Sequence, residues 1–357
     1  MRALGPVSVV VVNWNGERYL DACLSSVAKL EGGVDEVLVV DNASTDGSLA
    51  LLRERHPSVR ILRLDRNEGP APARNAGMRA AANRWVLALD NDAVLEPDVL
   101  EKLALAAASA PGIAIAQPRS VFHGEPGRVH YDGGSFHYAG LISLRNFYRP
   151  LPEAQGQGTL DVDCAVAVAL LVDREALLEA GGYDEDYFIL FEDLDLSYRL
   201  RALGRRIVSV EDAIVLHQAG TPGISFREGP SYPASRVFYH ARNRWLFLAK
   251  DLRLRTLLVA LPGLLLYEAV WFGFSVLSGG TLAWLRGKRR FLALLPRALE
   301  KRRAFQALRR VRDRDLLVGG PLTVTPAVSS STWKRAVLAS LDLSLRAWWG
   351  LARHLAA

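Results

Sequence analysis

Trp85-Val86-Leu87-Ala88-Leu89 is an apolar run that ends in Asp90-Asn91-Asp92. The five apolar residues predict a short strand that is buried on both faces. The two carboxylates follow where this strand leaves the core. They suit Mg²⁺ or Mn²⁺, hard cations that take oxygen ligands and keep positions for substrate phosphates. The triplet suits an Asx-rich turn equally well, so by itself it leaves both interpretations open.

Strands and helices alternate on both sides of this run. The predicted strands are Val7–Val12, Val37–Val40, Arg60–Leu64 and Trp85–Leu89. The predicted helices are Leu20–Val27, a short helix that Leu49 and Leu52 mark and that ends near Pro57, Ala71–Asn83, and one from Pro97 to about Ser109. This order predicts an α/β fold, with a Rossmann-like, mostly parallel, doubly wound sheet and helices on both faces. Ligands of such sheets bind at the carboxyl ends of the strands.

Polar residues gather at those strand ends. Asn13-Trp14-Asn15-Gly16, Asp41-Asn42 and Asp90-Asn91-Asp92 each follow a predicted strand. This coincidence favours a functional site over the turn interpretation. The sequence has neither the Gly-x-Gly-x-x-Gly fingerprint of a dinucleotide site nor a phosphate loop, so side chains and a metal would have to hold any nucleotide.

A second acidic cluster lies later in the chain. After a looser stretch from Arg119 to Gly158, the pattern predicts a long strand at Asp161–Val172 and a helix at Arg174–Ala180, and Glu192-Asp193 then opens a further helix. Acids at a helix N-terminus are stabilised by roughly 0.3–1 kcal/mol, which would explain the pair without a function. The alternative is a general base that accepts the proton of an attacking hydroxyl.

Charge and cysteine content give broader bounds. The chain has 357 residues and a formal charge of +6, yet residues 286–314 hold twelve Lys or Arg against two acids. The rest of the chain is therefore mildly acidic. Cys23 and Cys164 lie in apolar surroundings, which fits a reducing compartment better than a disulfide scaffold. We see no signal peptide, since the run Val7–Val12 is too short.

Six motifs occur in a fixed order over about the first 245 residues. They are VVVVNWNG (Val9–Gly16), VVDNASTDGS (Val39–Ser48), NEGPAPARNAG (Asn67–Gly77), LALDND (Leu87–Asp92), GGYDEDYFILFEDLDLSYRLRALG (Gly181–Gly204) and His217-Gln218-Ala219-Gly220. With them the chain resembles the inverting family 2 glycosyltransferases of the GT-A fold, and among these the rhamnosyltransferase-like branch. The set is specific, whereas one motif alone would not be.

The resemblance implies a role for each matching position. Asp41 is expected to bind the pyrimidine base of a nucleotide-sugar, in a donor pocket that Asn13, Asn15, Asn67 and Asn91 line. Asp90 is expected to contact the ribose or the sugar, and Arg74 to lie near the diphosphate, where a guanidinium suits phosphate geometry. Asp92 and His217 resemble the ligands of a divalent Mn or Mg ion. Asp193 resembles the catalytic base, with Glu192 positioning the acceptor.

These roles imply an inverting mechanism. The acceptor hydroxyl attacks the anomeric carbon while the nucleoside diphosphate leaves in line, and the metal and Arg74 stabilise the leaving group. Two departures from the family pattern stand out. Pro70 replaces an aromatic residue in the donor loop, and Ala241 replaces the Gln of the Gln-x-x-Arg-Trp motif that precedes Arg244-Trp245. The second departure favours transfer of a single sugar over processive synthesis.

The end of the chain predicts contact with a membrane. Residues 256–285 carry one charge, Glu268, and could span a bilayer, but Pro262 and Gly279-Gly280 also allow two shorter helices in the interface. The basic stretch 286–314 would then lie on anionic head groups, and Trp333–Leu355 predicts one more amphipathic helix. The basic stretch lacks the interleaved aromatic residues that would favour nucleic-acid binding. We therefore expect a catalytic domain at 1–245 and a helical membrane-associating region at 246–357.

The leading hypothesis is a metal-dependent glycosyltransferase that uses a dTDP- or UDP-sugar. The acceptor would be a hydroxyl of a lipid-linked or cell-surface glycan, in cell wall or polysaccharide biosynthesis, and the enzyme would lie in the cytoplasm at the inner face of the cell membrane. Two alternatives stay open: a transferase that makes a polyprenyl-phosphate sugar, and a scaffold that binds a nucleotide-sugar without turning it over.

Overall fold

The computed structural model describes residues 4–154, 156, 158–218, 232–326, 328–329 and 331–357. Its contacts divide the chain into two compact units. The first holds Met1–Gly134, Leu144–Arg201 and Arg205–Ala219, and the second holds Ser135–Ser143, Ala202–Gly204 and Gly220–Ala357. The predicted boundary between residues 245 and 246 falls inside a helix that belongs whole to the second unit.

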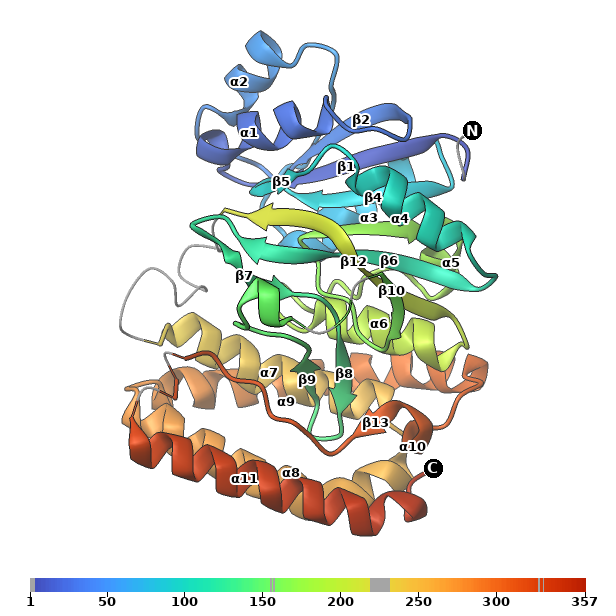
Figure 1. Cartoon of the computed structure of the whole chain (residues 1–357). Helices are drawn as coiled ribbons and strands as arrows, with labels where there is room; N and C mark the ends of the chain where they lie inside the picture. The colour runs from blue at the N-terminus through green and yellow to red at the C-terminus, as the bar shows by residue number, and fades with distance from the viewer. Residues whose placement is uncertain (1–3, 155, 157, 219–231, 327, 330) are drawn as a thin grey trace. The chain divides into compact units, whose positions relative to one another are not determined.

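One large sheet forms the centre of the first unit (Figure 1). Its strand order is β10-β12-β6-β11-β4-β1-β2-β3, with β5 paired to β12 and β7 paired to β6. The strands are β1 (Val7–Asn13), β2 (Val34–Asp41), β3 (Arg60–Arg63), β4 (Trp85–Asp90), β5 (Ala93–Leu95), β6 (Ile113–Phe122), β7 (Glu125–Tyr131), β10 (Thr159–Val162), β11 (Ala169–Asp173) and β12 (Arg206–His217).

Alternate residues of each central strand face two separate cores. Val9 and Leu87 pack with α1 (Glu17–Val27), α2 (Ser48–Arg55) and α4 (Val99–Ala108). Val10 and Val86 pack with α3 (Pro70–Ala80), α5 (Arg174–Glu179) and α6 (Glu192–Ala202) on the other face. The sheet is thus covered on both faces, as the buried apolar runs of β1 and β4 predict.

Every neighbouring pair is parallel in one half of the sheet, and in the other half β6 and β12 are parallel to each other. β4, β1, β2 and β3 are parallel neighbours, as the βαβα order predicts, whereas β11 runs antiparallel between β4 and β6, and β10 runs antiparallel to β12. The sheet is therefore mixed. The first half follows from the alternation of strands and helices, but the antiparallel insertions depend on pairing between distant segments.

The predicted strand Asp161–Val172 is two strands with a break between them. Side chains satisfy the backbone N–H groups in the break: Ala165 N donates to Ser197 Oγ (3.1 Å), Val166 N to Gln117 Oε1 (2.8 Å) and Ala167 N to Asp193 Oδ2 (3.0 Å). Hydropathy cannot reveal such a break, because the residues in it are as apolar as those of a strand.

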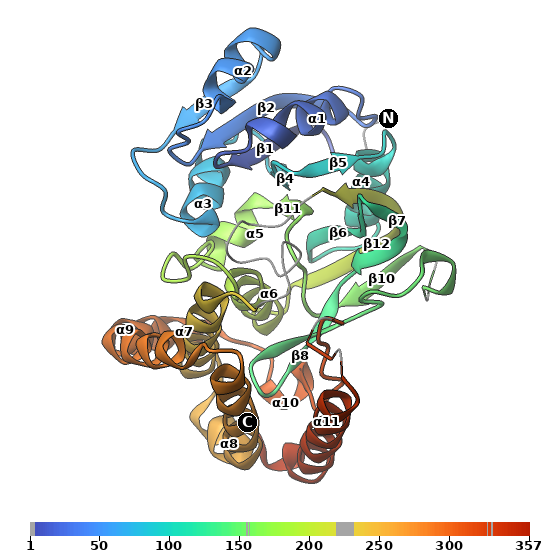
Figure 2. The ribbon, with the colours of Figure 1, turned by 90° about the vertical axis from the view of Figure 1, so that its left-hand side faces the viewer.

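The second unit is mainly helical. Its helices are α7 (Ala234–Asp251), α8 (Leu254–Leu277), α9 (Thr281–Leu308), α10 (Asp313–Leu316) and α11 (Thr332–Ala352). A small sheet joins β8 (Gly134–His137), β9 (Leu141–Leu144) and β13 (Leu317–Val318) in the order β13-β8-β9. Figure 2 shows α7 beside α9. Pro262 lies inside α8 without ending it, and the chain turns instead at Gly279-Gly280.

Candidate active site

Two asparagines and an aspartate meet at the carboxyl ends of β1 and β2. Asn13 Nδ2 donates to Asp41 Oδ1 (3.2 Å) and to Ser44 Oγ (3.1 Å), and both Asn13 and Asp41 are fully buried. Asn15 takes a left-handed conformation (φ 47°), and its Oδ1 accepts from Thr45 N (2.8 Å). Parallel pairing of β1 with β2 places Asn13 opposite Asp41, so the register of the sheet builds this corner.

Asn42 holds the loop that follows β3. Its Nδ2 donates to Asn67 Oδ1 (3.0 Å) and to the Gly69 carbonyl (3.0 Å), and its Oδ1 accepts from Glu68 N (3.1 Å). Gly69 has φ 90°, and a Cβ there would lie 2.1 Å from the Phe188 carbonyl oxygen. Only glycine fits this position, where the loop touches the segment that precedes α6.

Arg74 on α3 is the centre of an acidic cluster. Its Nη2 lies 2.7 Å from Asp90 Oδ1, and its Nη1 lies 3.4 Å from Glu192 Oε1 and 3.7 Å from Asp193 Oδ1. The Arg74 side chain is 5% exposed. One cation thus joins the carboxylate at the end of β4 to both acids at the start of α6, which are more than a hundred residues further along the chain.

Burial and mutual repulsion shift the pKa values of the two acids at the start of α6. Burial, with the neighbouring Asp193 carboxylate, raises the pKa of Glu192 to about 8 against the opposing effect of Arg74. Burial also raises the pKa of Asp193, while Arg74 and the amide of Ala167 oppose the rise. Among the described residues no group donates a hydrogen bond to Asp193 Oδ1, which is buried. A buried carboxylate oxygen without a donor has the character of a proton acceptor.

Asp92 and His217 meet because β5 pairs with β12. Ala93 lies opposite His217 in this antiparallel ladder, and Gln218 N donates to the Asp92 carbonyl (2.9 Å). His217 Nε2 is 3.2 Å from Asp92 Oδ2, and His217 Nδ1 is 2.9 Å from His130 Nδ1. A hydrogen bond between these two nitrogens requires one of them to carry a proton, so the tautomers of His130 and His217 are linked.

The donor set fits a hard divalent cation. Asp92 supplies an oxygen and His217 a nitrogen, and both side chains are 12% exposed. In the part of the chain that the structure describes, no group of three or more His, Cys, Asp or Glu side chains is arranged to hold a metal. Mg²⁺ at a nucleotide site is usually held by one or two carboxylates, with the remaining positions left to phosphate oxygens and water. Asp92 fits this pattern, and His217 adds an imidazole nitrogen of the kind that transition metals accept.

The structure places all the predicted site residues in the first unit. Asn91 Nδ2 donates to Asn13 Oδ1 (2.7 Å), which links the β1 corner to the Asp90-Asn91-Asp92 segment. Three further residues support the site although sequence reasoning missed them: Asn42, His130 and Asn75, whose side chain bonds both backbone groups of Tyr183 (2.8 Å each). Asn42 follows Asp41 in a quoted motif, whereas nothing in the sequence singles out His130.

Comparison with known proteins agrees with this geometry. The model of glycosyl transferase family 2 matches residues 8–178. The chain is 29% identical over 269 residues to the N-acetylglucosaminyl-diphospho-decaprenol L-rhamnosyltransferase of Mycobacterium tuberculosis, covering 68% of this chain and 83% of that protein. It is 40% identical over 111 residues to the succinoglycan biosynthesis protein ExoO of Rhizobium meliloti, and it spans about a third of that protein's length (32%).

A solved structure shares the fold. The crystal structure of GalNAc-T7 with UDP, GalNAc and Mn²⁺ superposes with a TM-score of 0.53 at 20% identity, covering 69% of this chain and 51% of that one. The predicted α/β fold of the GT-A type is therefore confirmed. At this identity the likeness concerns the fold alone.

Proposed function

The chain belongs to glycosyl transferase family 2, and on that premise we propose that it is an inverting, metal-dependent hexosyltransferase with a nucleotide-diphospho-sugar donor. The observation that carries the proposal is the Arg74 guanidinium, which joins Asp90 at the end of β4 to Asp193 at the start of α6. A donor-side acid and a candidate base thus lie within reach of one reacting sugar. Neither an Asx-rich turn nor a favourable helix N-terminus requires that link.

The donor pocket follows from the strand ends of the first unit. Asp41 and Asn13 would bind the pyrimidine base, with Asn15, Asn67 and Asn91 lining the pocket. Asp90 would meet the ribose or the sugar, and Arg74 lies on the same side, where it can stabilise a diphosphate. We propose dTDP-rhamnose or a related dTDP- or UDP-sugar, because the mycobacterial relative is named a rhamnosyltransferase.

Asp92 and His217 would hold a Mn²⁺ or Mg²⁺ ion. The bound cation would supply Lewis-acid stabilisation of the departing diphosphate. The protein's own contribution is to keep both side chains on one sheet edge, through the pairing of β5 with β12, and to link the tautomer of His217 to that of His130. A ligating His217 Nε2 must give up its proton, and that proton then lies between the two Nδ1 atoms.

Asp193 would act as the general base. It accepts the proton of the acceptor hydroxyl while the hydroxyl oxygen forms a bond to the anomeric carbon and the bond to the diphosphate oxygen breaks. Attack on the face opposite the leaving group inverts the anomeric centre. Glu192, whose pKa of about 8 keeps it protonated at neutral pH, can donate a hydrogen bond that positions the acceptor.

We place the reaction on a lipid-linked or cell-surface glycan in cell wall or polysaccharide biosynthesis. The rhamnosyltransferase relative is named for a diphospho-decaprenol acceptor, and ExoO for succinoglycan biosynthesis. A nucleotide-sugar donor implies a cytoplasmic catalytic unit, and a lipid-linked acceptor implies attachment to the inner face of the cell membrane. Among the described helices, α8 is long and apolar enough to cross a membrane.

A donor panel tests the proposal. Purified protein is mixed with UDP-, dTDP- and GDP-sugars, with Mn²⁺ or with chelator, and donor binding and hydrolysis are measured. We expect tight binding of one pyrimidine donor only with the metal. If no nucleotide-sugar is hydrolysed under any condition, the alternative of a non-catalytic scaffold replaces the proposal. If transfer to a polyprenyl phosphate survives Asp193→Asn, the alternative of a polyprenyl-phosphate transferase replaces it, since a phosphate acceptor needs no base.

A further inference from the structure

Helix α8 exposes an apolar stripe along its whole length. Its members recur at helical spacing and are 39–64% exposed: Leu254, Leu258, Leu261, Leu265, Phe272 and Val276. The stripe covers about 33 Å at 1.5 Å per residue. Among the described residues, every exposed large apolar side chain except Trp14, Leu105 and Leu178 lies at or after Leu254. Contiguous exposed apolar surface of this extent marks a binding surface.

Glu268 lies at the border of this stripe, three residues after Leu265 and four before Phe272, and its side chain is 16% exposed. This carboxylate pairs with Arg244 of α7 and with Lys288 of α9 (2.6 Å), and it accepts from the indole nitrogens of Trp245 (2.8 Å) and Trp284 (3.0 Å). The single charge of the apolar segment thus faces inward. The exposed stripe contains no charge at all.

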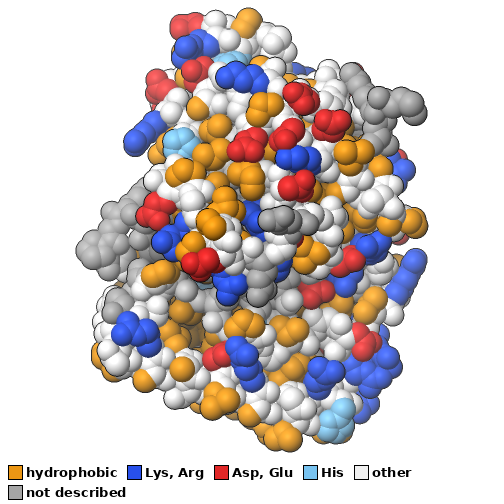
Figure 3. All heavy atoms as spheres, viewed as in Figure 1, with side chains coloured by type: hydrophobic (Ala, Val, Ile, Leu, Met, Phe, Trp, Pro, Cys, Tyr) orange, Lys and Arg blue, Asp and Glu red, His pale blue; other side chains and the backbone are white. Residues whose placement is uncertain are grey.

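Helix α11 runs antiparallel beside α8 and extends the apolar surface. Trp348 Nε1 donates to the Val259 carbonyl (3.0 Å), and Arg255 Nε donates to the Leu355 carbonyl (2.7 Å). Trp333, Leu343 and Leu351 of α11 are 55–73% exposed. In Figure 3, apolar side chains follow the edge of the molecule where Figure 1 draws these two helices, with Lys and Arg beside them.

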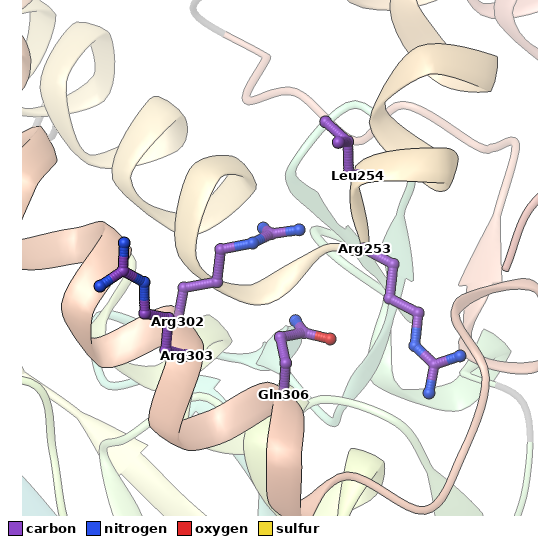
Figure 4. A pocket seen from close by; sticks show the side chains of 5 residues that line it. All are labelled: Arg253, Leu254, Arg302, Arg303 and Gln306. Atoms are coloured by element: carbon purple, nitrogen blue, oxygen red, sulfur yellow. The ribbon is translucent and has the colours of Figure 1, made fainter.

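A basic pocket of about 340 Å³ adjoins the start of the stripe. Arg253, Leu254, Arg302, Arg303 and Gln306 line it. In Figure 4, Arg302 and Gln306 extend from α9 toward the linker that carries Arg253. Arg302 is held there by the Ala249 carbonyl (2.7 Å), and Gln306 by the Asp251 carbonyl (2.7 Å). Guanidinium groups around an open pocket suit a phosphate group.

We propose that the second unit binds an anionic phospholipid bilayer with α8 and α11 in the plane of the membrane, and that the pocket of Arg253, Arg302 and Arg303 takes a lipid phosphate. The inference rests on the proposed function, from which it takes membrane attachment. It adds the contact face, the orientation of the helices and a headgroup site. An apolar stripe bordered by arginines has the composition of an interfacial helix.

The contacts of α8 decide between lying in the plane and spanning. A spanning α8 would draw Arg244 and Lys288 into the hydrocarbon, since both are bonded to Glu268. Each charge at the bilayer centre costs about 2.5–3.5 kcal/mol on insertion scales. In the plane of the membrane, the same helix buries its uncharged stripe and leaves every ionic contact in place.

Vesicle sedimentation tests the surface. The full-length protein is mixed with phosphatidylcholine vesicles with or without phosphatidylglycerol. We expect binding to the anionic vesicles, a loss of about tenfold or more in Leu258→Glu/Leu265→Glu, and about a fivefold loss in Arg303→Glu, since a basic residue near the surface contributes about 1 kcal/mol. Leu105→Glu and Arg53→Glu, at exposed positions of α4 and α2, serve as matched controls and should bind like wild type.

Three results of this assay would overturn the docking surface. These are equal binding to neutral and anionic vesicles, unchanged binding of the leucine double variant, and losses in the control variants as large as those in α8. Unchanged binding of Arg303→Glu would remove the headgroup site. Donor hydrolysis in solution is measured on the same samples. Lost vesicle binding with intact hydrolysis counts against the inference alone, and lost hydrolysis with intact vesicle binding counts against the proposed chemistry alone.

Depth measurements test the orientation. Single cysteines at Leu254, Leu265 and Val276 carry a fluorophore, and lipid-attached quenchers at several depths locate each label. Both native thiols are buried, so labelling goes to the introduced cysteines. Helices in the plane of the membrane place the three labels at one shallow depth. A spanning helix places Leu265 deep and the two ends shallow, and that profile would overturn the proposal.

Discussion

Arg74 is the residue on which the candidate site depends, because three carboxyl groups share its single charge. Burial raises the pKa of Asp90, Glu192 and Asp193 together. The folded protein holds the Glu192 proton to a pH near 8, whereas an exposed glutamate loses it near 4.5. The contribution of Glu192 to the free energy of unfolding therefore falls as the pH rises from about 4.5 to about 8.

We expect Asp193→Asn to lower kcat by about 10²- to 10⁴-fold, the usual contribution of a general base, while donor affinity stays unchanged. In the wild type, kcat should fall as the pH drops through the raised pKa of Asp193, because only the carboxylate accepts a proton. Rapid-quench kinetics with donor binding measured in parallel check both points. Glu175→Gln, an exposed acid in α5, is the control, and equal losses in the two variants would contradict the role.

Asp92→Asn and His217→Ala should each weaken Mn²⁺-dependent donor binding by about tenfold or more, which equals about 1.4 kcal/mol. The reason is that each substitution removes one of two protein ligands. Calorimetric titration of the donor with Mn²⁺ and with chelator gives the comparison. Asp98→Asn, at the residue that precedes α4 and whose side chain is 43% exposed, should behave as wild type. Affinity that does not respond to chelator in any of these proteins would exclude the metal site.

His130→Ala should lower Mn²⁺ affinity by roughly 10- to 100-fold, the range found for residues that orient a metal ligand. Donor binding in the presence of chelator should not change. His130→Gln keeps a hydrogen-bonding side chain and should recover part of the affinity, and His123→Ala, at an exposed position, is the control. A loss of metal-free donor binding in His130→Ala would indicate a general structural role instead.

At the scale of elements, the loop after β3 and the segment before α6 touch at Gly69. Gly69→Ala should lower Tm more than Gly112→Ala does. Both glycines have positive φ, but a Cβ at Gly112 would meet no atom within 4 Å. Conformational strain alone costs about 1–2 kcal/mol. The difference in Tm between the two variants measures the cost of the contact with Phe188. Equal Tm values would show that the loop moves to accommodate the added Cβ.

The sequence predicts the elements of the sheet's parallel half better than those of the other half. β1 and β4 follow from uninterrupted apolar runs, and the site residues at their ends follow from strand order. The break between β10 and β11 was not predictable, because its amides bond to Ser197, Gln117 and Asp193 from distant segments. His130 was missed for the same reason, since its contact with His217 arises from pairing across 87 residues.

Prediction from the sequence meets the same limit at helix α8 of the second unit. Pro262 and Gly279-Gly280 both predict a break, but only the glycines provide one. Glu268 reads as an obstacle to membrane contact in the sequence. In the structure it turns inward onto Arg244 and Trp245, so the exposed stripe of α8 stays free of charge. Periodicity marks a helix as apolar, but only its partners decide which side is covered.

At the scale of the whole molecule, the two units should unfold in separate steps. Six of the eight tryptophans belong to the second unit: Trp245, Trp271, Trp284, Trp333, Trp348 and Trp349. A pyrimidine nucleotide with Mn²⁺ at about 100 times its Kd should stabilise the first unit by about 2.7 kcal/mol. Scanning calorimetry should then show one shifted transition, while the tryptophan fluorescence midpoint moves little. A single transition that shifts in both signals would contradict this division.

The shared charge of Arg74 also has a consequence for engineering. Buried carboxylates that repel one another oppose folding, so neutralising one of them should make the protein more heat-resistant as it becomes less active. Asp193→Asn would then raise Tm while it lowers kcat by about 10²- to 10⁴-fold. A screen for thermal tolerance alone would therefore enrich substitutions in this cluster first. A library of variants of this chain must also be selected for turnover if the cluster is to be retained.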